Sequence, residues 1–165
     1  MPEVTSGVFR TVKSGDLLVW DEANHGFWGK LVIKFIRFMT MSEYGHVGIA
    51  VVEDGYTYVL EAVQPRVQYV SMSGKTNFYV VSMNLDKTED LVKIAKKYVG
   101  YRYSLLDCVR GYLGLTTLSD ERWQCAELTA MVYEDLGVEL VTEHMTPSGV
   151  VRAALSHSGS TLWVY

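Results

Sequence analysis

Three chemically reactive side chains follow one another along this chain, and their types are those of a thiol hydrolase site. His46 begins the apolar run 46–52, Glu61 lies inside the apolar run 58–63, and Cys125 precedes a helical pattern. A thiolate nucleophile needs a neighbouring imidazole as base and a polar group that orients the imidazole. These requirements concern geometry and not chain order, so the elements that carry the three residues decide whether they meet.

The two apolar runs are separated by Asp54-Gly55, which predicts a β-hairpin with a two-residue turn. That register pairs Val52 with Thr57, Ala50 with Val59 and Gly48 with Glu61. Strand side chains alternate between faces, so His46 shares a face with Glu61 and lies diagonally from it, within reach of its side chain. Gly48 and Ala50 are small, so we expect this face to receive a helix at close range.

Cys125 is predicted to open a helix. Leu128, Val132 and Leu136 recur after it at helical spacing, and Gly137 provides a C-terminal stop. The unpaired amides and the dipole at a helix N-terminus stabilise a thiolate. Because the apolar stripe faces the core, we expect Cys125 to meet His46 on the small-residue face of the hairpin.

Each of the three residues also has a purely structural interpretation. A lone cysteine on an apolar stripe is more often a small core side chain, which is the expected role of Cys108. A histidine at a strand start is usually structural or solvated. Glu61 is harder to explain in this way, because a carboxylate within an apolar strand is costly to bury without a partner. The three residues together therefore favour a working site.

Four short motifs are spread over nearly the whole chain. They are Gly15-Asp16-Leu17-Leu18, Tyr44-Gly45-His46-Val47-Gly48-Ile49, Leu60-Glu61-Ala62 and Gln124-Cys125-Ala126-Glu127-Leu128. Their order and spacing resemble those of the circularly permuted NlpC-type papain-like cysteine hydrolases, specifically the YiiX-like group. The resemblance implies Cys125 as the nucleophile, His46 as the base and Glu61 as the residue that orients the base. Gly45 and Ala126 stand where many members carry serine.

The fold class expected from these patterns is α+β, with an antiparallel β-sheet and helices packed against it. Residues 78–81 and 162–165 are predicted strands. Residues 86–99 are a predicted helix, begun by a capping box of Asp86 and Glu89 and ended by Gly100. The resemblance implies that residues 1–165 form a single permuted papain-like catalytic domain.

Composition excludes several other classes of protein. The chain has 165 residues, of which 48% are hydrophobic and 21% charged, enough for one core but not for a second domain. The net charge of −4 and the lack of a basic stripe argue against nucleic-acid binding. No Cys-x-x-Cys or paired-histidine spacing occurs, so we expect neither a metal site nor a cofactor. No signal peptide or transmembrane segment is recognisable, so a cytoplasmic location is expected.

The segment 27–41 is apolar apart from Lys30, Lys34 and Arg37, which line one edge of the predicted helix. One interpretation of this segment is structural: a mostly buried helix with one solvated edge, too short and too charged to span a membrane. The other interpretation is functional: because the segment leads into Tyr44, we expect it to border the site. Tyr44, Lys30, Lys34 and Arg37 are then substrate-binding residues that contact an anionic or acyl substrate, and the cationic edge suits a peripheral contact with a membrane surface.

The function expected from these residues is cleavage of an amide bond through an acyl-enzyme. The family resemblance implies cell-wall-type peptides or related amides as substrates. One alternative is a lipid acyl hydrolase or acyltransferase of the lecithin:retinol acyltransferase-like kind, which uses the same acyl-enzyme. Another is a non-catalytic binding module on the same fold. The expected partner is thus a small peptide, amide or acyl-lipid substrate, and the sequence specifies neither its identity nor the oligomeric state.

Overall fold

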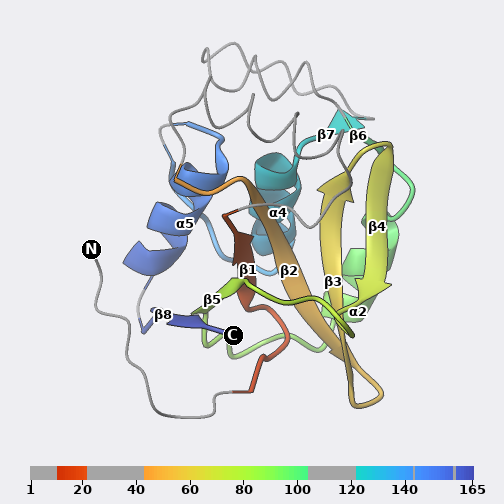
Figure 1. Cartoon of the computed structure of the whole chain (residues 1–165), viewed down its shortest axis with the longest axis horizontal. Coiled ribbons are helices and arrows are strands. Elements are labelled where there is room, and N and C mark those ends of the chain that lie inside the picture. The colour runs from red at the N-terminus through yellow and green to blue at the C-terminus, as the bar shows by residue number, and fades with distance from the viewer. Residues whose placement is uncertain (1–10, 22–42, 104–121, 143, 158) are drawn as a thin grey trace.

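A computed structural model describes residues 11–21, 43–103, 122–142, 144–157 and 159–165 (Figure 1). The described strands are β1 (Leu17–Trp20), β2 (His46–Glu53), β3 (Tyr56–Val63), β4 (Arg66–Ser71), β5 (Tyr79–Ser82), β6 (Arg102–Tyr103), β7 (Arg122–Trp123) and β8 (Thr161–Val164). The described helices are α2 (Leu91–Tyr98), α4 (Cys125–Asp135) and α5 (Pro147–Ser156).

The strands form one eight-stranded sheet in the order β7-β6-β4-β3-β2-β1-β5-β8. Neighbouring strands are antiparallel, except for the short β6–β7 pair, which is parallel. The three described helices pack on one face of this sheet (Figure 1). The predicted α+β class with an antiparallel sheet and packed helices is therefore confirmed. None of the helices within the described residues is long and apolar enough to cross a bilayer.

The β2–β3 hairpin has the predicted turn. Asp54 and Gly55 adopt φ angles of 52° and 80°, the left-handed conformation that a two-residue turn requires at both positions. The ladder pairs Val52 with Thr57 and Ala50 with Val59, as the sequence predicts. The local turn chemistry alone therefore sets the register of the strands that carry His46 and Glu61.

The hairpin opens at the end that carries His46. The β2–β3 ladder ends at the pair Ile49–Leu60, one pair short of the predicted pair Gly48–Glu61. Gly48 still faces Glu61 in the predicted register, since a Cβ on Gly48 would lie 3.3 Å from Glu61 Cβ. Beyond this point β2 follows β1, where Trp20 pairs with His46, and β3 follows β4, where Glu61 pairs with Gln68. Figure 1 shows β2 and β3 diverging at this end, with the first turn of α4 between them.

The helices cover the face opposite to the predicted one. Val47, Ile49 and Val51 of β2 belong to the large core cluster, together with Leu128 and Val132 of α4. The expectation that α4 packs over Gly48 and Ala50 was therefore wrong. The branched side chains offer more apolar area to bury, worth about 25 cal/mol per Å².

The space above Gly48 is already filled from within the sheet. A Cβ there would lie 2.7 Å from Val59 Cγ2 and 3.0 Å from the Leu60 carbonyl oxygen. Ala50 and Val59 belong instead to a second cluster, which includes Leu18, Trp20, Phe78 and Trp163. Gly48 thus permits close contact between neighbouring strands and not the approach of a helix.

Three other predicted elements are found in the structure, with boundaries that differ from the predicted ones by one residue or more. The predicted strands 78–81 and 162–165 correspond to β5 and β8, which pair with each other. Gly137 follows the end of α4 with φ 79°, as expected of a helix stop. The helix predicted from Asp86 begins later, at Leu91, with Asp90 at its N-cap position and no side-chain capping bond.

Candidate functional site

Cys125 is the first residue of α4, as the sequence predicts. Gln124 is the N-cap, and its side chain accepts a hydrogen bond from the amide of Glu127. Glu127 Oε2 in turn accepts one from the amide of Gln124 at 3.3 Å, which completes a capping box. This local arrangement fixes the helix start, so that Cys125 lies in the first turn with only 6% of its surface exposed.

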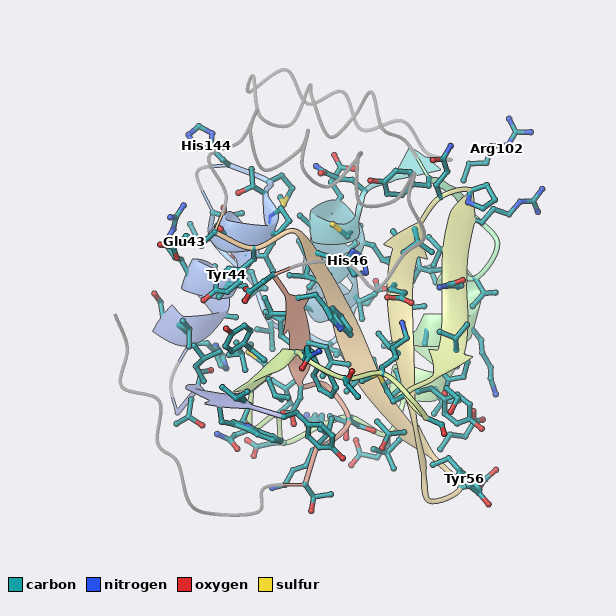
Figure 2. The ribbon with its side chains drawn as sticks, viewed as in Figure 1. Glu43, Tyr44, His46, Tyr56, Arg102 and His144 are labelled. Carbon is teal, nitrogen blue, oxygen red and sulfur yellow. The ribbon has the colours of Figure 1, made fainter. Side chains whose placement is uncertain are left out.

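His46 and Glu61 form a buried pair. The Nε2 atom of His46 lies 2.9 Å from Oε2 of Glu61, and the side chains of the two residues are 7% and 1% exposed. Cys125 also hydrogen-bonds to the His46 ring. Because Nε2 faces Glu61, Nδ1 is the ring nitrogen left for Cys125. The structure therefore brings together the three residues predicted as a triad, and Figure 2 shows His46 near the divergent ends of β2 and β3.

The electrostatics of this pair favour its charged form. Burial alone lowers the pKa of His46, but hydrogen bonds and negative charge from Cys125 and Glu61 outweigh burial and raise it to about 9. Burial raises the pKa of Glu61, but His46 and Lys75 outweigh it and lower the value to about 2. His46 is thus an imidazolium and Glu61 a carboxylate across the neutral range.

The second oxygen of Glu61 has two further partners, which the sequence interpretation missed. Gln68 Nε2 donates to Oε1 at 2.8 Å, and Lys75 Nζ donates to the same atom at 2.5 Å. Gln68 is the cross-strand neighbour of Glu61 on β4, so a prediction of β4 with its register would have found it. Lys75 comes from the loop between β4 and β5, and no local pattern in the sequence signals its contact.

The pH dependence of stability should reveal the His46–Glu61 pair. The pKa of Glu61 falls from 4.5 to about 2 on folding, so its contribution is present above pH 4.5 and is lost as the pH falls toward 2. The pKa of His46 rises from 6.5 to about 9, so its contribution is complete below pH 6.5 and is lost as the pH rises toward 9.

We therefore expect the pair to stabilise the fold most between about pH 4.5 and 6.5. Thermal midpoints measured from pH 2 to 10 on the wild type and on His46→Gln provide the check. The wild type should lose stability between pH 6.5 and 9, and the variant should lose much less there. Parallel curves for the two proteins across that interval would contradict the pair's role.

The start of α5 contacts both segments that lead into the site. Ser148 Oγ accepts hydrogen bonds from the amides of Glu43 at 3.0 Å and Tyr44 at 3.4 Å, just before His46. Gln124 Nε2 donates to the carbonyl oxygen of Met145 at 2.9 Å, just before Cys125. These bonds hold the approaches to His46 and Cys125 against one helix. Sequence reasoning missed α5, although Thr146 accepts from the amide of Gly149 and Pro147 opens the helix, both common start signals.

The predicted substrate-binding residues are only partly described. Tyr44 is half-buried beside the core, and its ring makes a T-shaped contact with the Tyr79 ring at a centroid distance of 6.1 Å. Tyr79 donates a hydrogen bond to Asp21 Oδ2 at 3.0 Å. Lys30, Lys34 and Arg37 lie outside the described residues, as does Cys108. The substrate-binding role of all four predicted residues stays a prediction.

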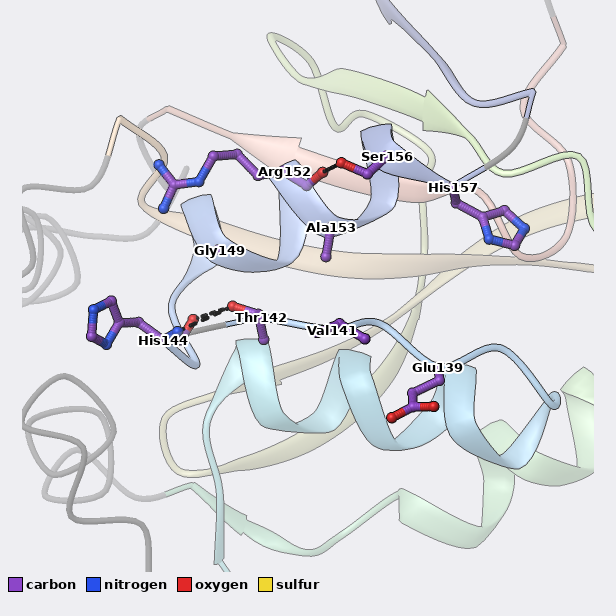
Figure 3. A pocket seen from close by; sticks show the side chains of 9 residues that line it. All are labelled: Glu139, Val141, Thr142, His144, Gly149, Arg152, Ala153, Ser156 and His157. Carbon is purple, nitrogen blue, oxygen red and sulfur yellow. Dashed lines mark hydrogen bonds between the residues drawn. The ribbon is translucent and has the colours of Figure 1, made fainter.

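Two cavities lie away from the three central residues. One, of about 390 Å³, is lined by α5 and the segment before it (Figure 3). Its lining residues are Glu139, Val141, Thr142, His144, Gly149, Arg152, Ala153, Ser156 and His157. The other, of about 620 Å³, lies between α2 and the end of α4. Neither is lined by Cys125, His46 or Glu61. Within the described ranges, no group of three or more His, Cys, Asp or Glu side chains is arranged to hold a metal ion.

The fold and the buried cluster define an α+β protein in which a helix-start cysteine meets a histidine–carboxylate pair. No family model matches the chain. It is 29% identical over 112 residues to the curated protein YiiX of Escherichia coli (strain K12), described as uncharacterized, which covers 62% of this chain. The chain spans about half the length of that relative, since the match covers 50% of it.

A solved structure has the same fold. It is described as a crystal structure of the metalloprotein YiiX from Escherichia coli O157:H7, and it matches with a TM-score of 0.62 at 19% identity. The match covers 92% of this chain and 96% of that one. The two similarities together support a relationship to a YiiX-like group.

Proposed function

We propose that this protein is a cysteine hydrolase of the permuted papain-like (NlpC-type) kind, which cleaves an amide bond through an acyl-enzyme. The observation that carries the proposal is the bond of 2.9 Å between His46 Nε2 and Glu61 Oε2, with the Cys125 side chain hydrogen-bonded to the same ring. Covalent catalysis needs a nucleophile within hydrogen-bond reach of a base, and a third group that orients the base.

The reaction has two steps. The thiol proton of Cys125 passes to His46, which holds it as an imidazolium, and the Cys125 sulfur then attacks the carbonyl carbon of the amide. The tetrahedral intermediate collapses to a thioester as His46 gives its proton to the leaving amine. A water molecule, deprotonated by His46, then attacks the thioester and releases the acid and the free thiol. Glu61 holds the ring by Nε2 throughout and stabilises the imidazolium.

The first turn of α4 supplies stabilisation for the developing oxyanion. The amides at a helix start have no partner within the helix, and their dipoles favour negative charge. The capping box uses the amide of Glu127, which leaves the amides of Cys125 and Ala126 as donors in this turn. An oxyanion bound there would lie next to the sulfur that forms it.

The described residues around Glu61 do not fit a metal site, although the YiiX structure is described as that of a metalloprotein. A metal-binding carboxylate presents free oxygens to the ion. Here Oε2 faces His46, and Oε1 accepts from Gln68 and from the ammonium of Lys75. A metal ion at Glu61 would have to displace Lys75, so the described residues around Glu61 act in the proposed reaction as a hydrogen-bonded carboxylate and its partners.

We propose a cell-wall-type peptide or related amide as the substrate, with Tyr44 and the cations Lys30, Lys34 and Arg37 contacting it. The alternatives are transfer or hydrolysis of a lipid acyl group by the same acyl-enzyme, and a binding module without turnover. All three outcomes differ in what becomes attached to Cys125, so one experiment separates them.

The test is to trap the acyl-enzyme. The protein is mixed with peptidoglycan fragments or with phospholipid vesicles, quenched in acid, and analysed by intact mass and peptide mapping. We expect a mass increase on Cys125 equal to the acyl part of a peptide fragment. A fatty-acyl mass would favour the lipid reaction, and neither adduct nor product with either substrate would favour the binding module. Cys125→Ala is the control and should acquire no adduct.

A further inference from the structure

The Glu61 carboxylate is held by two cations and not by one. Its side chain is 1% exposed, yet it pairs with His46 through Oε2 and with Lys75 through Oε1. In the proposed reaction, once the Cys125 proton has passed to His46, the three buried groups are a thiolate, an imidazolium and a carboxylate, with a net charge of minus one. An unneutralised charge is costly to bury. The ammonium of Lys75 makes the four groups neutral together.

Lys75 is itself held in place. It lies in the loop between β4 and β5, where its amide donates to the carbonyl oxygen of Met72 at 3.0 Å. Its Nζ atom lies 5.4 Å from the centroid of the Trp20 ring, a cation–π distance. The Trp20 ring contacts His46 with centroids 5.4 Å apart. Lys75 thus contacts both Glu61 and Trp20, and each of these two residues in turn contacts His46.

We propose that Lys75 is a positioning residue for this site: its ammonium anchors Glu61 as a carboxylate aimed at His46. The inference deepens the proposed function and rests on the role of His46 as base. Gln68 donates to the same oxygen and helps to orient it, but an amide brings no charge. Of the two described partners of Oε1, Lys75 supplies both a hydrogen bond and a counter-charge, and its side chain remains 24% exposed.

The test compares three variants with the wild type. Lys75→Met removes the charge and keeps the length of the side chain, and Lys75→Arg keeps the charge and the contact with Trp20. Lys96→Met is the matched control, because Lys96 pairs with Glu53 at 2.6 Å with its side chain 55% exposed. The titration of the His46 imidazole is followed by NMR, and the rate of Cys125 alkylation by iodoacetamide is measured against pH. The titratable groups facing the pair among the described residues are Cys125 of α4 and Lys75 of the loop.

Loss of the Lys75 charge should shift both pH profiles. A cation near His46 favours loss of the imidazolium proton, so its removal in Lys75→Met should raise the midpoint of the His46 titration by about 0.5–1 pH unit. The rise of the alkylation rate with pH should also move to higher pH. Lys75→Arg and Lys96→Met should leave the His46 midpoint and the alkylation profile equal to those of the wild type within experimental error. A purely structural role would lower the thermal midpoint of Lys75→Met but leave its profiles in place, and that result would overturn the proposal. Lys75→Gln replaces Lys75→Met if the latter does not fold.

This readout separates the two proposals because it needs no substrate. An unchanged His46 midpoint in Lys75→Met, with acyl-enzyme formation intact, would overturn the role of Lys75 alone. A shifted midpoint in a protein that forms no acyl-enzyme would sustain the coupling of Lys75 to the pair and overturn the hydrolase assignment.

Discussion

Replacing His46 with alanine is expected to reduce turnover by about 10⁴- to 10⁶-fold, and Cys125→Ala should reduce it at least as much. The imidazole accepts the thiol proton, protonates the leaving amine and activates the water, so its removal affects every step of the proposed reaction. Cys125 provides the only bond to the acyl group. Initial rates on the substrate identified by acyl-enzyme trapping provide the measurement.

The control for these variants is the folded state, because both residues are buried. Circular dichroism and thermal midpoints should show folded proteins before rates are compared. Ser73→Ala, in the exposed loop between β4 and β5, is a neutral comparison. A folded Cys125→Ala variant that retains wild-type turnover would contradict the assignment of the nucleophile.

Glu61→Gln is expected to reduce turnover by about 10²- to 10⁴-fold, less than His46→Ala does. The glutamine amide can still bond to His46 Nε2, but its two orientations conflict with different partners. With its oxygen toward His46, its NH₂ group meets the donors of Gln68 and Lys75, which now bond to Oε1. With its NH₂ group toward His46, it favours the tautomer protonated at Nδ1, the nitrogen that faces Cys125.

The double variant tests whether the two residues act as one unit. Glu61 is proposed to act only through His46, so Glu61→Gln combined with His46→Ala should be no slower than His46→Ala alone. Rates are compared in purified, folded proteins at one pH. Losses that multiply in the double variant would show that the two residues act independently.

The sequence alone determined the elements that hold the site. The turn at Asp54-Gly55 depends on two residues that tolerate positive φ, so it fixes the hairpin and most of its register without help from the rest of the chain. The start of α4 depends on the capping box between Gln124 and Glu127, and its end on Gly137. Such signals act within a few residues, and they put Cys125 at a helix start and His46 diagonal to Glu61.

Only the tertiary structure decided how these elements meet. The point at which β2 and β3 separate depends on their other partner strands, β1 and β4. The face of the sheet that α4 covers depends on the apolar area that the assembled sheet offers on each side. The contacts of Lys75 with Glu61 and of Ser148 with the backbone before His46 join residues far apart in sequence. Local patterns carry no information about such contacts, because they form only when the sheet and helices pack. The three reactive residues could thus be predicted from the sequence, whereas their neighbours and the charges next to them depend on the folded chain.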